Sequence, residues 1–346
     1  MDRRQFVKGS AMGMSVLASG FGVTDLKAGA GVETPVVPLG GAEGKIGRPV
    51  RVASIALTNG HPLDQVAELV DQEGAVGADL IILPETCQGQ RETTQEPLDG
   101  PTITTIARLA QKHQAYIVCP IDRIEGVRRF NSAVLIDRQG RVAAIYNKLY
   151  PVWQSECAER RVSPGDSVTV CQTDFGRVGL AICFDVNWVD PWERMANQGA
   201  ELVIWPSAYS AGRTLQARAI NYNYYIVSCT WVPDCQVFDI DGEQLVHEEN
   251  NRGNGVNVTR TTLDLDRCIF HHDLHYPEKR HKLLAEHAED VALDKDLRLE
   301  LWFVLKAKRA GVSARELARQ YGMEELRAYV NRSRCEIDKC RGWEFS

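Results

Sequence analysis

Short apolar runs rich in β-branched residues alternate with helical patterns along most of the chain, and this alternation most constrains its fold. Residues 50–57, 78–85 and 200–208 have the length and composition of strands that are buried on both faces. Residues 63–76 and 101–113 instead place apolar side chains at helical spacing. Strands and helices that alternate in this way predict an α/β fold with mixed sheets.

The pattern changes beyond residue 285, where the spacing of apolar residues becomes helical. One predicted helix face consists of Leu297, Leu301, Val304 and Leu305. A second helix is expected to begin after Ser313. The sequence therefore predicts a principal domain over residues 48–285 and a helical extension over residues 286–346.

The first 30 residues have the pattern of a targeting segment rather than of a folded domain. Paired arginines, Arg3 and Arg4, precede an uncharged apolar stretch, and small residues suited to cleavage follow at Ala28 and Ala30. The paired arginines resemble a twin-arginine signal peptide, which implies export to the periplasm or the extracellular space. Residues 31–47 are rich in glycine and proline and are expected to form a linker.

Charge, hydropathy and cysteine usage argue against several classes of protein. The 346 residues carry a net charge of −6, which does not suit a nucleic-acid-binding surface. The apolar stretch near the N-terminus is too short for an ordinary membrane span and contains three glycines. The ten cysteines form no CxxC pair, so mostly free thiols are expected, although Cys335 and Cys340 are candidates for a disulfide.

A reactive side chain follows an apolar strand at three places. Glu85 ends the run LIILPE, Lys148 ends AAIYNK and Cys183 ends GLAIC. Taken singly, each has an ordinary structural explanation as a solvated carboxylate, an exposed lysine or a small core residue. Strand ends of an open sheet meet at one edge, so the three side chains are expected to converge there.

The blocks that carry these residues resemble the signature blocks of a known family. LIILPE, NKLYP and GLAICFD are similar to the three blocks of the nitrilase superfamily, the carbon–nitrogen hydrolases. The resemblance continues through residues 205–208, 218–227 and 238–245 and covers roughly residues 48–280. It implies a four-layer α-β-β-α sandwich and a homodimer or larger assembly. It also implies hydrolysis of a non-peptide carbon–nitrogen bond in a small amide or N-carbamoyl compound, without a metal or an organic cofactor.

The resemblance implies a role for each of the three side chains. The Cys183 thiolate attacks the substrate carbon, Glu85 accepts and returns protons, and Lys148 stabilises the negative charge that develops on oxygen. A thioester forms on Cys183, and water then cleaves it. A base and a positive field suit this chemistry because a free thiol is only slightly ionised at neutral pH.

Further site residues are implied between and after these blocks. The family has a second glutamate after its lysine block, for which Glu156 and Glu159 compete, and the distance from Tyr150 favours Glu156. An asparagine, Asn187, stands where many members of the family carry an arginine four residues after the cysteine. The pocket is expected to include Phe184, Asn187, Trp188 and Tyr209, although core packing explains the aromatic residues equally well.

Other interpretations of the sequence remain open. Nitrile hydrolysis and acyl transfer use the same three residues, and a binding module that keeps the fold without catalysis is an alternative from another class. A papain-like peptidase needs a partner histidine, and no histidine here lies in a recognisable block. A metal site at His271, His272 and His275 is a weaker alternative because the spacing fits no strong zinc motif. A helix-turn-helix in the C-terminal tail is also weaker, because its resemblance to that motif is loose.

Overall fold

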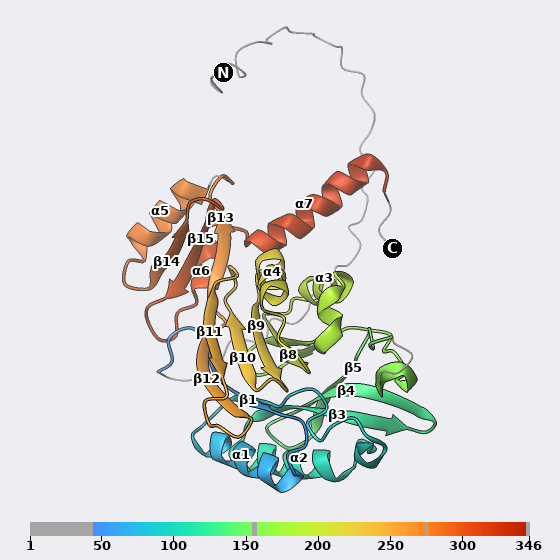
Figure 1. The fold of residues 1–346 in the computed structure, drawn as a ribbon. Coiled ribbons are helices and arrows are strands. Elements are labelled where there is room, and N and C mark those ends of the chain that lie inside the picture. Colours follow the sequence, from blue (N-terminus) through green and yellow to red (C-terminus); the bar gives the residue numbers. More distant parts are fainter. Residues whose placement is uncertain (1–43, 154–157, 275, 344–346) are drawn as a thin grey trace, which may run out of the picture. The chain divides into compact units, whose positions relative to one another are not determined.

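Two β-sheets lie face to face, with helices on both outer sides (Figure 1). The computed structural model describes residues 44–153, 158–274 and 276–343. The predicted signal peptide and residues 31–43 of the predicted linker lie outside this part of the chain. The order of the layers is helices, sheet, sheet and helices, which confirms the predicted four-layer α-β-β-α fold.

The first sheet is mixed, and helices cover its outer face. Its strands, in spatial order, are β12 (Val256–Asp264), β1 (Pro49–Leu57), β2 (Leu80–Ile82), β3 (Tyr116–Glu125), β4 (Arg128–Ile136) and β5 (Val142–Asn147). β1, β2 and β3 pair in parallel, and the other pairs are antiparallel. Helices α1 (Leu63–Ala75) and α2 (Pro101–His113) pack on this sheet through apolar residues that include Val66, Val70 and Ile106.

The second sheet repeats this arrangement. Its strands, in spatial order, are β11 (Gln244–Glu249), β10 (Asp234–Phe238), β9 (Tyr225–Thr230), β8 (Leu202–Ser207), β7 (Arg177–Leu180) and β6 (Thr169–Gln172). β7, β8 and β9 pair in parallel. Helices α3 (Asp190–Asn197) and α4 (Gly212–Tyr222) cover the outer face with buried side chains such as Trp192 and Leu215.

Apolar side chains from both inner faces form the core between the sheets. Val52 and Ile82 of the first sheet share this core with Leu180 and Ile204 of the second, and all four are buried. Full burial of one such side chain contributes about 1.5–3 kcal/mol. Short 3₁₀ helices lie in the connections, namely η2 (Glu92–Thr94), η3 (Ala158–Arg161) and η4 (Cys183–Asn187).

The C-terminal region contains a third sheet as well as the predicted helices. Its elements are β13 (Cys268–His271), α5 (Tyr276–Glu286), β14 (Val291–Leu297), β15 (Trp302–Ala307), α6 (Ala314–Gln320) and α7 (Leu326–Arg341). β15 lies between β13 and β14 and pairs antiparallel with both. The prediction of a helix through Leu297 and Leu305 is therefore wrong. Residues 302–305 form a run of aromatic, β-branched and aliphatic side chains, which suits a central strand once β13 supplies a partner.

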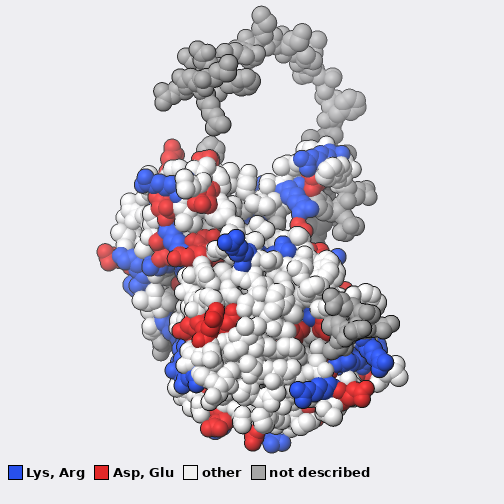
Figure 2. Space-filling model, in the orientation of Figure 1, with Lys and Arg blue, Asp and Glu red and all other residues white. Residues whose placement is uncertain are grey.

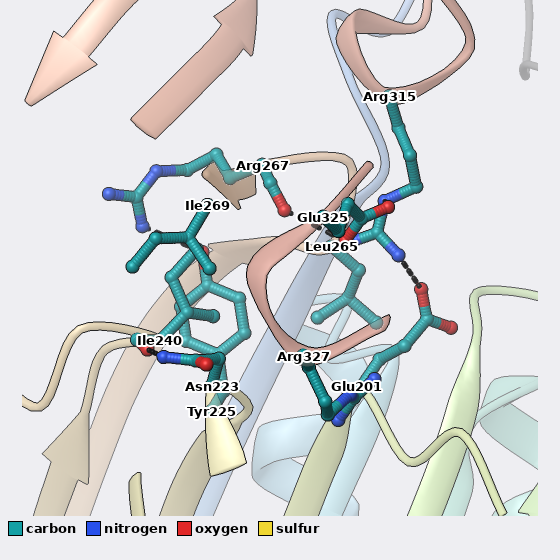
Figure 3. A pocket seen from close by; sticks show the side chains of 10 residues that line it. All are labelled: Glu201, Asn223, Tyr225, Ile240, Leu265, Arg267, Ile269, Arg315, Glu325 and Arg327. Atoms are coloured by element: carbon teal, nitrogen blue, oxygen red, sulfur yellow. Dashed lines mark hydrogen bonds and ion pairs between the residues drawn. The ribbon is translucent and has the colours of Figure 1, made fainter. Parts of the chain in front are cut away.

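A group of charges with little solvent exposure connects this C-terminal region to the second sheet; we call it the docking cluster. Its members are Arg48, Glu201, Asp239, Arg267, Lys295 and Arg315. Figure 3 shows Arg315 reaching Glu201 across the junction, where Nη1 and Oε1 lie 3.2 Å apart. The cavity beside them has a volume of about 20 Å³, enough for about one water molecule. This cavity is too small for a substrate. The members of the cluster bond one another across the junction, which is typical of a structural contact.

Charges of both signs are interspersed on the face of the molecule that Figure 2 shows. On α7, several basic residues pair with acidic ones: Arg334 Nη1 bonds Glu193, and Arg341 Nη1 lies 2.9 Å from Asp338 Oδ1. Such pairing does not resemble the continuous basic surface that contacts a phosphate backbone. The helices among the described residues are too short or too polar to cross a bilayer.

Candidate active site

The ends of three strands bring Glu85, Lys148 and Cys183 together. Glu85 follows β2, Lys148 follows β5 and Cys183 follows β7, so the first two come from one sheet and the third from the other. Lys148 Nζ lies 2.9 Å from Glu85 Oε1, and all three side chains are buried. The charges of Glu85 and Lys148 both act on the Cys183 thiol. A carboxylate, an ammonium group and a thiol thus share one buried place.

Cys183 lies on a turn with an unusual backbone conformation. Its φ angle is 46°, in the left-handed region that residues other than glycine rarely adopt, and it begins η4 directly after the strand region. Trp205 Nε1 donates to the Cys183 carbonyl oxygen at 2.9 Å. The turn therefore fixes the direction of the thiol, and a buried indole N–H holds the turn in place.

The carboxylate of Asp185 joins this turn to the segment that carries Lys148. It accepts hydrogen bonds from Ile182 N at 2.9 Å, from Tyr146 Oη at 2.7 Å and from Tyr150 N at 2.9 Å. Burial raises the pKa of Asp185 to about 6, although Lys148 and these donors oppose the effect of burial. Asp185 thus couples the positions of the thiol and the ammonium group.

A second glutamate contacts Lys148, and it is Glu159. Both of its carboxylate oxygens accept from Lys148 Nζ, at 2.9 and 2.8 Å, and Val152 N donates to Oε2 at 2.6 Å. Glu159 is buried on η3. Glu156, which the sequence favoured, lies outside the described residues. The spacing from Tyr150 alone did not indicate which glutamate the chain turns toward the lysine.

Sequence reasoning missed Asn131, which is buried on β4 between the two glutamates. Asn131 Nδ2 donates to Glu85 Oε1 and to Glu159 Oε1, each at 2.7 Å. Its Oδ1 atom and Glu85 Oε2 have no hydrogen-bond partner among the described residues. The available signal was a polar residue, in the run RRFNSAVLI, just before the apolar half of a strand.

The electrostatic environment sets the charge of each group. Burial lowers the pKa of Lys148, but the surrounding negative charges outweigh it and raise the value, so the ammonium group stays charged. Burial raises the pKa of Glu159, but Lys148 outweighs it and holds the value below normal. Burial and then Glu85 raise the pKa of Cys183 more than Lys148 lowers it. The resting thiol is therefore protonated, and a base must remove its proton when it reacts.

The four predicted pocket residues lie on or beside the cysteine turn. Phe184 and Trp188 meet edge to face with centroids 5.4 Å apart, and Asn187 Nδ2 donates to the Phe184 oxygen at 3.1 Å. Tyr209 packs edge to face on Trp205 at 5.7 Å, and its hydroxyl lies within electrostatic reach of Cys183. None of the four is fully buried. Their partial exposure next to the thiol suits contact with a ligand as well as packing.

Groups that resemble metal sites have other partners in this structure. Asp239, Asp241 and Glu243 lie close enough together to hold a cation, but Lys295 Nζ reaches all three at 2.6 Å. His272 Nε2 lies 3.0 Å from Asp296 Oδ1, and His275 lies outside the described residues. These contacts are ion pairs and hydrogen bonds of the kind found in structural clusters.

Solved structures with a similar fold include two from different organisms. Nit3 of Saccharomyces cerevisiae, from branch 10 of the nitrilase superfamily, has a TM-score of 0.55 at 19% identity, over 73% of this chain and 98% of that one. A mutant amidase from Nesterenkonia sp. AN1 has a TM-score of 0.54 at 20% identity, over 62% and 90%. That amidase carries the acetamide moiety of fluoroacetamide on its active-site cysteine. At these identities the likeness shows the fold alone.

Curated relatives match this chain over part of their length. The nitrilase and fragile histidine triad fusion protein of Drosophila melanogaster is 31% identical over 191 residues, 49% of this chain and 41% of that protein. The (R)-stereoselective amidase of Pseudomonas sp is 33% identical over 132 residues, 36% and 47%. N-carbamoylputrescine amidase of Arabidopsis thaliana is 31% identical over 157 residues, 40% and 51%. The chain spans about half the length of these relatives.

One family model matches the greater part of the described chain. It is described as Carbon-nitrogen hydrolase and matches residues 51–268. The matched region includes Glu85, Lys148, Glu159 and Cys183. The chain belongs to the carbon–nitrogen hydrolase family.

Proposed function

We propose that this protein hydrolyses a non-peptide carbon–nitrogen bond in a small amide or N-carbamoyl compound. The observation that carries the proposal is the thiol of Cys183 beside a buried Lys148 that two glutamates hold in place. Burying three charged groups together is costly for stability, and such arrangements persist where they serve a reaction. Cys183 is proposed as the nucleophile, Glu85 as the base and acid, and Lys148 as the stabiliser of the oxyanion.

The proposed reaction has two halves that use the same groups. Glu85 Oε2 accepts the thiol proton while the Cys183 sulfur bonds to the carbonyl carbon, and Lys148 donates to the oxygen that becomes negative. One such donor contributes on the order of 3 kcal/mol to the transition state. The carbon–nitrogen bond then breaks as Glu85 gives its proton to the departing amine. Water loses a proton to Glu85, attacks the thioester and releases the acid, and the proton returns to the sulfur.

The proposed substrate class follows from the named relatives and from one departure in the sequence. The Pseudomonas and Arabidopsis proteins are named as amidases, and the latter name specifies an N-carbamoyl compound. Amides and carbamoyl compounds are therefore favoured over nitriles, which react through the same sulfur. Asn187 provides a neutral amide beside the cysteine turn, so a substrate that requires an arginine at this position is disfavoured.

The test is hydrolysis of a panel of small amides and N-carbamoyl compounds by the purified full chain. Release of ammonia or amine is expected from at least one compound, and Cys183→Ala abolishes it. Cys171→Ala is the matched control, because Cys171 lies on β6 and is only partly buried. Turnover that survives in Cys183→Ala contradicts the proposal, and so does a broad panel without any turnover by the wild-type protein.

Export and self-association belong to the same proposal. Arg3, Arg4 and the apolar stretch after them support export by the twin-arginine route to the periplasm or beyond. The family resemblance supports a homodimer or larger assembly. Replacement of both arginines by lysine is expected to retain the protein in the cytoplasm, as fractionation will show. Light scattering of the purified protein tests the assembly.

A further inference from the structure

The buried amide of Asn131 holds three groups of the site from one position on β4. Its Nδ2 atom donates to Glu85 Oε1 and to Glu159 Oε1, both at 2.7 Å. Its backbone oxygen accepts from Lys148 N at 2.9 Å, which fixes the start of the lysine segment. Asn131 has no exposed surface. Its contacts therefore consist of the protein's own reactive groups and not of solvent.

The two carboxylates need donors besides the ammonium group that they share. Neighbouring like charges raise the pKa of one carboxyl group, because both resist being ionised together. Lys148 supplies one positive charge to both Glu85 and Glu159. A side-chain amide is neutral at every working pH and carries two N–H donors on one nitrogen. Asn131 thus stabilises both charged carboxylates without changing the net charge of the site.

The same contacts decide which oxygen of Glu85 is available for proton transfer. Oε1 accepts from both Lys148 and Asn131, whereas Oε2 has no partner among the described residues. We propose that Asn131 is a positioning residue that orients Glu85 so that Oε2 serves the Cys183 thiol and later the attacking water. This role rests on the function proposed above for the same site.

The test compares Asn131→Asp with a matched variant, Asn257→Asp. Aspartate has nearly the shape of asparagine, but it removes the donor and places a third carboxylate beside Glu85 and Glu159. Asn257 is also fully buried, lies on β12 of the same sheet, and donates to Thr259 Oγ1 at 2.9 Å. The matched variant therefore has the same chemical change in a strand that does not contact the site's charged groups.

The measurement is the rate at which iodoacetamide alkylates Cys183 in the folded full chain, followed across pH by mass spectrometry of the Cys183 peptide. Asn131→Asp is expected to move the rate profile upward by about one pH unit, which lowers the rate about tenfold on its steep part. Asn257→Asp is expected to keep the wild-type profile. Asn131→Ala, which removes the donors without adding a charge, is expected to move the profile in the same direction by less.

Thermal unfolding identifies any variant that does not fold, and Asn131→Ala then replaces Asn131→Asp in the comparison. The positioning role is overturned if the folded Asn131 variants keep the wild-type dependence of the alkylation rate on pH. It is also overturned if Asn257→Asp shifts this dependence as far as Asn131→Asp does. Alkylation needs no turnover, so it separates this inference from the proposed function. A wild-type protein that hydrolyses no amide contradicts the function, whereas the profiles report on Asn131 alone.

Discussion

Two groups of ionised side chains lie within this protein, and they differ in how completely their carboxylates are bonded. In the docking cluster, Asp239 Oδ1 accepts from Arg267 at 2.5 Å and Oδ2 accepts from Lys295 at 2.6 Å. Both oxygens of Glu201 are bonded as well, Oε1 to Arg48 and Oε2 to Arg177 N. In the site, Glu85 Oε2 has no partner among the described residues.

The difference indicates what each cluster contributes. A carboxylate whose oxygens accept from cationic partners is held in its charged form, and in the docking cluster such bonds hold segments together. A buried carboxylate with one unbonded oxygen reduces stability, so its presence in the site points to a role in a reaction. Cys183, which shares the site with Glu85, has a left-handed φ angle. Backbone strain of this kind is concentrated at functional sites, so it also indicates a role in a reaction. Three changes test this contrast, from the largest expected effect to the smallest.

Glu85→Gln is expected to have the largest effect, and the effect falls on activity. Glutamine keeps an oxygen that accepts from Lys148 but cannot take a proton, so kcat falls by about 10³-fold, within the range for loss of a general base. The midpoint of thermal unfolding should not fall, because one buried charge is removed from a cluster with two carboxylates and one ammonium group. Steady-state kinetics and calorimetry measure both quantities. A large loss of stability together with a wild-type kcat would show that Glu85 has a structural role and not a catalytic one.

Asp239→Asn is expected to show the opposite pattern. The change removes the counter-charge that Arg267 and Lys295 share, while Asp294 still pairs with Arg267 and Asp241 with Lys295. Loss of such charged hydrogen bonds is expected to cost about 2 kcal/mol of unfolding free energy. The folded variant should keep the wild-type kcat, since the docking cluster touches none of the site residues described above. Denaturant unfolding and kinetics at 25 °C check the pair of expectations. A drop in kcat without a loss of stability breaks the comparison.

Asp185 sharpens the comparison, because its carboxylate is fully bonded but only by neutral groups. Burial therefore raises its pKa to about 6, whereas cationic partners lower the pKa of Asp239. A raised pKa means that the folded state binds a proton more tightly than the unfolded state. The contribution of Asp185 to the free energy of unfolding is thus fully present below about pH 4 and is lost as the pH rises through about 6.

Activity is expected to change in the opposite direction over the same range. Protonated Asp185 is a poorer acceptor for Ile182 N and Tyr150 N, so the cysteine turn loosens and kcat falls below about pH 6, by several-fold. Asp185→Asn should lower kcat at neutral pH and remove this limb of the pH profile. If the kcat of folded Asp185→Asn still falls below the same pH as that of the wild-type protein, another group controls this loss of activity.

The sequence located the strand-end residues because residue type and local pattern are enough to find them. Glu85, Lys148 and Cys183 each follow an apolar run, and the ends of β2, β5 and β7 meet, although these strands belong to two facing sheets and not to the single open sheet that the sequence suggested. The sequence favoured Glu156, which lies outside the described residues, whereas the contacts of Glu159 with Lys148 come from a partner eleven residues away that local pattern does not specify. Asn131 was missed because it is one of several polar residues in its strand, and only partners distant in sequence distinguish it from the others.

The third sheet shows the same limit at the level of secondary structure. The spacing of Leu297, Leu301, Val304 and Leu305 fits a helix face, yet Trp302–Ala307 forms a strand between two others. Its pairing with Cys268–His271 spans more than thirty residues of chain, so tertiary contacts override the local periodicity. Helix α6, which Ser313 caps, follows a local signal and begins where the sequence predicted a helix, and α7 lies in the region that was predicted to be helical.

The most direct test of the account is to trap the acyl-enzyme by rapid acid quench during turnover of a hydrolysed amide. Peptide mass spectrometry should find the acyl group on Cys183, on no other cysteine, and not at all in Cys183→Ala. Turnover with no acyl group on Cys183 at any quench time, or with the group on another residue, contradicts the claim that this buried thiol is the nucleophile.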